Sequence, residues 1–266
     1  MKCSGPEPGG PQEPATGAGL RLFVFPHAGG WSLMFQDWPD RFPSGWRVRA
    51  LDAPGHGTLL DTPPLTDAEA LVTHFLDRLM PEITDDRTPF AFFGHSMGSL
   101  VAYELTRRLL AEGLTPPVWL GISAFAIARP DDETPSPLDA ALPDDELRHG
   151  LGVLGGTSAD VLADPRLWAV FAPAVRADLM VLRDLRAAPP GDPLPVALSA
   201  FAGTDDRAAP PARVAPWAER TTRFLGLRVL PGGHFYFQDD LDALAARVTA
   251  DVHTALRTPV PVADVR

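Results

Sequence analysis

The chain has 266 residues, 45% of them apolar and 21% charged, as is ordinary for a soluble globular protein with one large domain or two small ones. Its formal net charge of −11 argues against a partner that is nucleic acid or a membrane surface. The one cysteine, Cys3, excludes a disulfide framework, and no segment has the roughly 18 consecutive apolar residues of a membrane-spanning helix. We therefore expect a soluble, cytoplasmic protein.

Glycine and proline dominate residues 1–19, which predicts a disordered tail. From residue 20 onward, short apolar segments alternate with segments of helical periodicity. Strands are predicted at 20–25, 46–52, 89–94 and 117–125, and helices at 31–41, 65–80 and 97–112. Thr66 and Glu69 have the spacing of a capping box at the start of the second helix. This alternation predicts an α/β fold with a mostly parallel central sheet and helices on both faces.

The alternation stops between about 128 and 187, where a proline-rich and acidic linker at 128–143 precedes a purely helical region. That region is predicted to form helices at 144–154, 158–163 and 165–187. The pattern then resumes with strands at 195–203 and 225–233 and helices at 211–220 and 238–256. We interpret 128–187 as a helical lid inserted into a core made of 20–127 and 188–258. The helix at 165–187 has an apolar stripe that either packs the lid onto the sheet or partly roofs the site: Leu167, Trp168, Phe171, Val175, Leu179, Met180 and Leu182.

The sequence GHSMG, residues 94–98, joins a predicted strand to a predicted helix. A Gly-x-Ser-x-Gly sequence in that context is the pattern of a nucleophile elbow, whose sharp turn presents the serine and leaves no room for Cβ atoms at the glycines. Ser96 is therefore the predicted catalytic nucleophile. The alternative is that Ser96 only caps the helix that follows.

A serine nucleophile needs a histidine base, and in this architecture the histidine comes last in the chain order Ser, Asp or Glu, His. Three histidines follow Ser96, but His149 lies in the predicted insertion and His253 in the last helix. His234 follows a strand directly in the loop sequence LPGGHFYF. We therefore predict that His234 is the catalytic base.

The acid that orients the base is expected in the segment FAGTDDRAAP, which ends the strand at 195–203. Asp206 lies three residues past Gly203 and precedes a helix, so it is favoured as the catalytic carboxylate. Asp205 is the alternative.

The negative charge that develops on the substrate oxygen requires two N–H donors. The backbone N–H of Met97, directly after the nucleophile, is one predicted donor. Ala28, in the loop FPHAGG after the first strand, is the predicted second donor, with Gly29 as the alternative. No clustered metal-ligand spacing is present, so neither a metal nor a cofactor is expected. The remaining histidines near these motifs are interpreted as structural: His27, His56 and His95.

Several segments, in one order along residues 20–256, resemble the type II thioesterases of polyketide and nonribosomal-peptide assembly lines: LFVFPHAGG, ALDAPGHG, FFGHSMGSLVAYELTRRL, LPDDEL, LADPRL and LPGGHFYF. The resemblance implies a stand-alone α/β-hydrolase enzyme with a helical lid. It also implies hydrolysis of aberrant or stalled acyl groups from the phosphopantetheine arms of acyl or peptidyl carrier proteins. The triad of the family falls on Ser96, Asp206 and His234.

Two positions depart from the family pattern: Ala209 stands where many hydrolases have a larger apolar residue, and His56 stands where an arginine is frequent. The first departure leaves the choice between Asp205 and Asp206 open. Other functions compatible with the same residues are a general carboxylesterase, an acyltransferase of the same fold and a non-catalytic module that binds carrier proteins. A monomer is expected.

Overall fold

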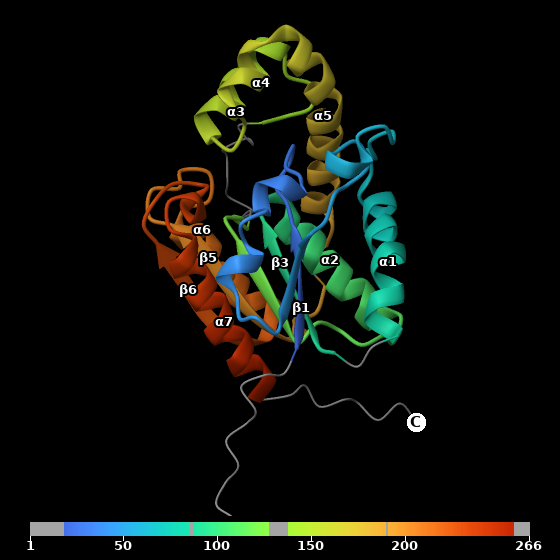
Figure 1. Cartoon of the computed structure of the whole chain (residues 1–266), viewed down its shortest axis with the longest axis vertical. Coiled ribbons are helices and arrows are strands. Elements are labelled where there is room, and N and C mark those ends of the chain that lie inside the picture. Colours follow the sequence, from blue (N-terminus) through green and yellow to red (C-terminus); the bar gives the residue numbers. More distant parts are fainter. Residues whose placement is uncertain (1–18, 86–87, 128–137, 190, 258–266) are drawn as a thin grey trace, which may run out of the picture.

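The computed structural model describes residues 19–85, 88–127, 138–189 and 191–257 (Figure 1). Most of the predicted tail at 1–19, including Cys3, lies outside these residues, as does most of the predicted linker at 128–143. None of the helices in the described ranges is both long enough and apolar enough to cross a membrane.

A parallel sheet of six strands, in the order β2-β1-β3-β4-β5-β6, forms the centre of the described part of the chain. The strands are β1 (Leu20–Phe25), β2 (Trp46–Ala50), β3 (Phe90–His95), β4 (Trp119–Ser123), β5 (Leu194–Gly203) and β6 (Thr221–Leu230). Strands β1, β3 and β4 are buried along their whole length. Burial on both faces explains why these strands read as continuous apolar runs. The parallel pairing confirms the predicted α/β architecture.

Helices cover both faces of the sheet. On one face, α2 (Met97–Ala111) packs on β3 and β4, and α1 (Ala68–Asp85) packs beside α2. On the other face, α7 (Leu241–Arg257) packs on β4 and β6. Because all the strands run in one direction, their carboxyl ends meet at one edge, where the loops that carry the candidate site residues lie together.

Within the described residues, three helices connect β4 to β5 and rise above the carboxyl ends of the strands (Figure 1): α3 (Asp144–Leu154), α4 (Ala159–Ala163) and α5 (Pro165–Ala187). Each lies within one residue of its predicted bounds. Asp164 caps α5 by accepting a hydrogen bond of 2.7 Å from the Arg166 N–H, and Pro165 takes the first helical position, where no intrahelical N–H partner is lost. Arg176 ties α5 to α3 through an ion pair of 2.6 Å with Asp144.

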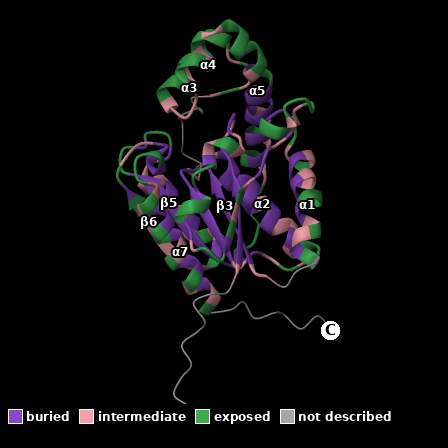
Figure 2. Ribbon diagram, in the orientation of Figure 1, coloured by how far each residue is buried: buried purple, intermediate pink, exposed green. Residues whose placement is uncertain are grey.

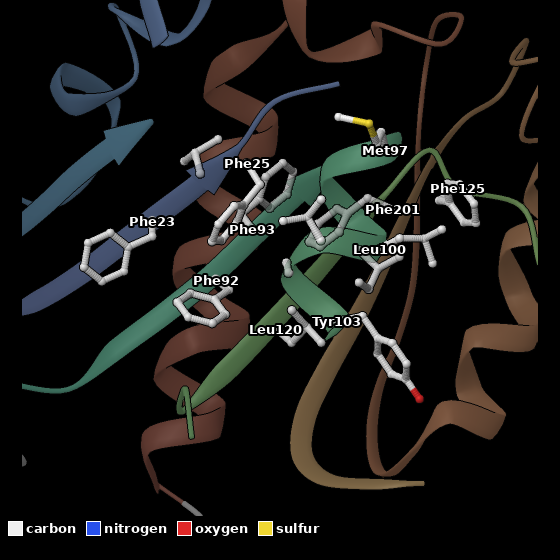
Figure 3. Close-up of a cluster of buried hydrophobic side chains, with 14 of the residues drawn as sticks. Phe23, Phe25, Phe92, Phe93, Met97, Leu100, Tyr103, Leu120, Phe125 and Phe201 are labelled. Atoms are coloured by element: carbon white, nitrogen blue, oxygen red, sulfur yellow. The ribbon is translucent and has the colours of Figure 1, made fainter. Parts of the chain in front are cut away.

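The core lies between the sheet and the helices, whereas the outer surfaces of α3 and α4 are largely exposed (Figure 2). Figure 3 labels four phenylalanines of β1 and β3. Phe23, Phe25 and Phe92 pack together on the face of the sheet that α1 covers, whereas Phe93 points to the opposite face and packs against Trp38. The rings of Phe25 and Phe92 meet edge to face with centroids 5.2 Å apart, a preferred aromatic geometry. This packing holds the ends of β1 and β3, which carry the two loops nearest Ser96.

Two predicted helices take a tighter form. The helix predicted at 31–41 is replaced by two short 3₁₀ turns, Ser32–Phe35 and Pro39–Arg41, because Pro39 has no N–H to continue a helical ladder. The helix predicted at 211–220 is α-helical only at Pro211–Val214 (α6) and continues as a 3₁₀ helix over Ala215–Arg220. Pro216 interrupts it in the same way.

The predicted capping box at Thr66 is wrong. Helix α1 begins at Ala68, and Asp67 caps it by accepting a hydrogen bond of 2.8 Å from the Ala70 N–H. Glu69 instead pairs with Arg108 on α2. Threonine and aspartate are both good cap residues, so residue type alone does not decide between Thr66 and Asp67. The backbone path before the helix decides which of them caps it.

Candidate active site

Ser96 occupies a strained turn between β3 and α2, with φ of 53° and ψ of −120°. Its backbone N–H donates to the Ser123 carbonyl at 2.8 Å, which anchors the turn to β4. A Cβ atom at Gly94 would lie 2.1 Å from the Gly98 carbonyl oxygen, and one at Gly98 would lie 2.0 Å from that of Phe25. The steric reason predicted for the two glycines is therefore confirmed. The Ser96 side chain makes no capping hydrogen bond to α2, so the cap interpretation loses support.

His234 and Asp206 lie in contact, and Asp205 does not take part. The Nδ1 atom of His234 is 2.8 Å from Oδ2 of Asp206, and both side chains are buried. Asp205 is exposed, and its carboxylate accepts a hydrogen bond from the Thr204 hydroxyl at 2.9 Å. Of the two acids that the sequence left open, the structure brings Asp206 to the histidine.

The loops after β5 and β6 bring these two residues together by close backbone packing. The Asp205 N–H donates to the Gly232 carbonyl at 2.8 Å, and the Thr204 N–H donates to that of Leu230 at 2.9 Å. A Cβ atom at Gly203 would lie 2.2 Å from the Gly233 carbonyl oxygen, so only glycine allows this approach. Gly203 at the end of β5 and the two glycines before His234 thus allow the two loops to pack against each other.

The Asp206 carboxylate is held in its ionised form. Its Oδ1 atom accepts hydrogen bonds of 2.9 Å from the N–H groups of Ala208 and Ala209. Burial alone would raise the pKa of Asp206, but the hydrogen bond from His234, the charge on that ring and the two N–H groups outweigh burial and lower it. An acceptor-only carboxylate beside Nδ1 fixes the proton of the neutral ring on that nitrogen. The other ring nitrogen, Nε2, is then left as an acceptor, and it has no hydrogen-bond partner among the described residues.

Two further buried histidines lie beside the site but do not contact Asp206. Burial, with the nearby His234 and His56 rings, lowers the pKa of His27 to about 3. Burial, with the nearby His234 and His27 rings, also holds the pKa of His95 well below its usual range, and its Nδ1 lies 2.8 Å from the Ser123 hydroxyl. Both rings are therefore neutral packing residues near pH 7, in agreement with the structural role predicted for them.

Ser96 and His234 line one cavity of about 80 Å³, to which helices α3 and α5 also contribute side chains. Its walls also include Leu151 and Leu154 from α3 and a set from the second half of α5: Leu179, Leu182 and Arg186. Only part of the predicted apolar stripe reaches the cavity, because Leu167 is 45% exposed on the outer side of the lid. The cavity is therefore a partly open, mainly apolar chamber lined by a serine and a histidine.

The two predicted oxyanion donors belong to segments next to this serine. Met97 is the first residue of α2, where a backbone N–H has no intrahelical partner. Ala28 lines the cavity together with Ser96. The alternative donor, the Gly29 N–H, already donates to Oδ2 of Asp178 at 2.6 Å. Ala28 is therefore the better candidate. No three His, Cys, Asp or Glu side chains gather as a metal site anywhere in the described ranges.

Residues 20–252 match the thioesterase domain family. The chain belongs to the thioesterase family. Among curated relatives, the gramicidin S biosynthesis protein GrsT of Aneurinibacillus migulanus is 30% identical over 229 residues, which cover 84% of this chain and 85% of GrsT. The medium-chain S-acyl fatty acid synthase thioesterase of Homo sapiens is also 30% identical, over 84% of this chain and 82% of the human protein.

Solved structures of thioesterases have the same fold as this thioesterase. RedJ, from the prodiginine biosynthetic pathway of Streptomyces coelicolor, superposes with a TM-score of 0.75 at 32% identity, over 90% of this chain and 92% of RedJ. The type II thioesterase BorB, from the borrelidin biosynthetic cluster, gives a TM-score of 0.76 at 29% identity, over 90% and 95% of the two chains. These likenesses confirm the predicted α/β-hydrolase fold and the predicted resemblance to type II thioesterases.

One buried acid near the site escaped the sequence prediction. Asp178 lies on α5, is 4% exposed, and contacts both Gly29 and His56. A signal was present, because Asp178 stands three residues after Val175 and four before Leu182, on the apolar face of the helix. An acid on an otherwise buried stripe requires a polar partner from another element.

Proposed function

We propose that this thioesterase is a serine hydrolase that removes aberrant or stalled acyl groups from the phosphopantetheine arms of carrier proteins in polyketide or nonribosomal-peptide biosynthesis. The main support for this reaction is that the strained Ser96 lines one cavity with His234. The Nδ1 atom of His234 is hydrogen-bonded to the buried Asp206 carboxylate. The substrate class is supported by relatives and structural neighbours that belong to such pathways, among them GrsT, RedJ and BorB.

In the first half of the reaction, Nε2 of His234 accepts the Ser96 hydroxyl proton while the serine oxygen attacks the thioester carbonyl. Asp206 stabilises the imidazolium that forms, and the N–H groups of Met97 and Ala28 stabilise the oxyanion. The carbon–sulfur bond then breaks, and the imidazolium returns its proton to the leaving thiolate. The products are an acyl-enzyme and the free phosphopantetheine thiol.

In the second half, His234 accepts a proton from a water molecule that attacks the acyl-enzyme. Collapse of the second tetrahedral intermediate breaks the ester bond, and the proton on His234 passes to the serine oxygen. The carboxylic acid leaves and the enzyme is regenerated. The small cavity supports hydrolysis of short acyl groups, because about 80 Å³ is small for a long chain unless the lid moves.

Carrier-protein recognition is proposed to rest on apolar contacts at the lid. With a net charge of −11, the protein supplies no long-range attraction for an acidic carrier protein. The outer side of the lid exposes three apolar side chains: Val153 on α3, and Leu167 and Val170 on α5. Such contacts suit weak, transient docking at the mouth of the cavity, with only the phosphopantetheine arm passing beneath the lid.

Two measurements test the proposal together. The same short acyl group, presented on a carrier protein and on coenzyme A, is expected to be hydrolysed with the higher kcat/KM from the carrier. Ser96→Ala is expected to abolish turnover of both donors and labelling by a serine-directed fluorophosphonate. Thr254→Ala, which removes a surface hydroxyl from α7, serves as the control and is expected to retain both. Equal kcat/KM for the two donors would leave a generic thioesterase, and turnover by Ser96→Ala within about tenfold of wild type would refute the nucleophile.

A further inference from the structure

A buried carboxylate joins the lid helix α5 to the loop of the candidate oxyanion hole. Oδ2 of Asp178 accepts the Gly29 N–H at 2.6 Å, and Nε2 of His56 lies 3.0 Å from the same oxygen. The side chains of Asp178 and His56 are 5% and 3% exposed. The histidine contact is close enough for an ion pair when the ring is protonated, although it does not have the geometry of a hydrogen bond. Both side chains are thus shielded from water, and each is the nearest polar side-chain partner of the other.

The surroundings of His56 favour a doubly protonated ring. Its Nδ1 atom lies 3.2 Å from the Pro54 carbonyl oxygen, which can only accept, so Nδ1 carries a proton. Its Nε2 atom faces the Asp178 carboxylate, which also accepts. A neutral ring would give up the bond to Pro54 or set a lone pair against a carboxylate. The imidazolium alone satisfies both contacts.

The other charged and titratable groups around His56 favour the same form. Burial opposes the charge on the ring, but Asp178 on α5, the Pro54 carbonyl and Asp52 at the end of β2 outweigh burial, so the pKa of His56 is raised. Although burial opposes its charge, Asp52 has a lowered pKa because donors from two loops satisfy its carboxylate. His27 faces the ring from the oxyanion loop and is neutral. Two carboxylates therefore surround one cation.

The oxyanion loop is pressed directly against α5. Gly29 has φ of +78°, and the Gly30 N–H donates to the His27 carbonyl at 2.8 Å, as in a type II turn. A Cβ atom at Gly29 would lie 2.6 Å from the Phe171 ring and 3.3 Å from Val175. The Gly29 N–H belongs to the central peptide of this turn. Its bond to α5 fixes that peptide and, with it, the turn that presents the Ala28 N–H.

We propose that Asp178 and His56 are positioning residues for the oxyanion hole: the ion pair holds the turn at 27–30 so that the Ala28 N–H faces the tetrahedral intermediate, and it does so only while His56 is protonated. This inference rests on the proposed function, because it assigns the donor loop of that reaction. Neither residue touches the substrate, so both act through the orientation of the loop.

The pH dependence follows from the sign of the shift. A histidine with a raised pKa keeps its ion pair as the pH falls and loses it as the pH rises through that raised value. Activity is therefore expected to fall at alkaline pH, where His56 loses its charge. Removing one oxyanion donor costs about 10²–10³-fold in kcat, so displacing one is expected to cost about 10–100-fold.

Three variants assayed as pH–rate profiles with an acyl-CoA substrate separate this role from a merely structural one. Asp178→Asn is expected to lower kcat about 10–100-fold with KM changed less than about threefold, and to remove the alkaline limb. His56→Arg keeps a cationic donor at every pH, so it is expected to retain kcat within about tenfold at pH 7 and to lose the alkaline limb. Asp251→Asn is the matched control, because Asp251 is 5% exposed and paired with Arg228 at 2.7 Å on the far side of the sheet. It is expected to lower the melting temperature and leave the alkaline limb in place.

Nitrogen-15 NMR of the His56 ring in the wild-type enzyme needs no variant to fold. Both ring nitrogens are expected to be protonated at pH 7, and the pKa from NMR should agree with that of the alkaline limb. A neutral His56 ring at pH 7, disagreement of the two pKa values by more than about one unit, or an Asp178→Asn enzyme with wild-type kcat and alkaline limb would each overturn the inference. An active Ser96→Ala enzyme would instead overturn the proposed function and leave the His56 titration standing.

Discussion

Replacing Asp206 with asparagine tests the charge relationship at the centre of the site with almost no change in shape. In the wild type, the carboxylate takes three hydrogen bonds, from His234 at 2.8 Å and from the N–H groups of Ala208 and Ala209 at 2.9 Å. The asparagine oxygen can keep the backbone bonds. Its amide group then points a donor at Nδ1 of His234 and stabilises the tautomer whose proton is on Nε2. That tautomer cannot accept a proton from Ser96.

The expected loss in kcat is on the order of 10⁴, as for the equivalent change in the best-studied serine triad, which corresponds to about 5.4 kcal/mol at 1.36 kcal/mol per tenfold. A smaller loss in stability accompanies it, about 1–3 kcal/mol for a charge-assisted hydrogen bond. The lowered pKa of Asp206 determines how the free energy of unfolding changes with pH. The ionised carboxylate stabilises the fold at pH values above its pKa in the unfolded chain. This stabilisation is lost as the pH falls through the pKa in the folded protein. Wild type and Asp206→Asn should therefore converge in stability in acid.

The assay is the release of coenzyme A thiol from a short acyl-CoA, with urea unfolding at several pH values as the second readout. Asp205→Asn is the matched control, because it makes the same chemical change one residue away on an exposed side chain. It should retain kcat within about threefold of wild type. If Asp205→Asn had the larger effect, or if Asp206→Asn stayed within tenfold of wild type, the assignment of the acid would be refuted.

Two further substitutions test the elbow and the chamber. Gly98→Ala should lower the free energy of unfolding by about 3 kcal/mol in urea titrations, because its Cβ would lie 2.0 Å from the Phe25 carbonyl oxygen. Gly113→Ala, at φ +69° in open space, should cost only about 1 kcal/mol, and equal costs would contradict the steric account. Leu182→Ala should move the acyl-chain optimum in kcat/KM toward longer chains, since Leu182 lines the cavity. An unchanged chain-length profile would show that acyl groups do not reach this wall.

The sequence predicts those elements whose signals are local. Helix α5 begins where Asp164 and Pro165 supply a cap and a preferred first residue, and both are visible in the chain. The strands appear as short apolar runs because the sheet is buried on both faces. The segment at 31–41 has helical periodicity as well, but Pro39 and the contacts of its aromatic side chains with the core decide for 3₁₀ turns. Tertiary packing overrode the local pattern there.

The same distinction between local signals and tertiary contacts applies to the site residues. Ser96 and His234 can be chosen from chain order and flanking glycines, because the elbow imposes those features on the sequence itself. Asp206 and Asp205 are adjacent and chemically identical, so they are distinguished by the path of the loop, which is set by backbone bonds such as the one from the Asp205 N–H to the Gly232 carbonyl. The pair of Asp178 and His56 joins elements 122 positions apart, and no local signal specifies such a pairing.

Helix α5 contacts both the wall of the cavity and the loop that carries the proposed oxyanion donor Ala28. Leu179 and Leu182 wall the cavity, Phe171 and Val175 press on Gly29, and Asp178 holds the N–H of that glycine. A rigid displacement of this stretch would therefore open the chamber and disturb the oxyanion loop at the same time. Motion that admits an acyl arm while the loop stays in place must be confined to α3, α4 and the first turns of α5, the part of the lid whose outer surface is exposed (Figure 2). The division therefore lies before Phe171, because Phe171 itself packs against Gly29.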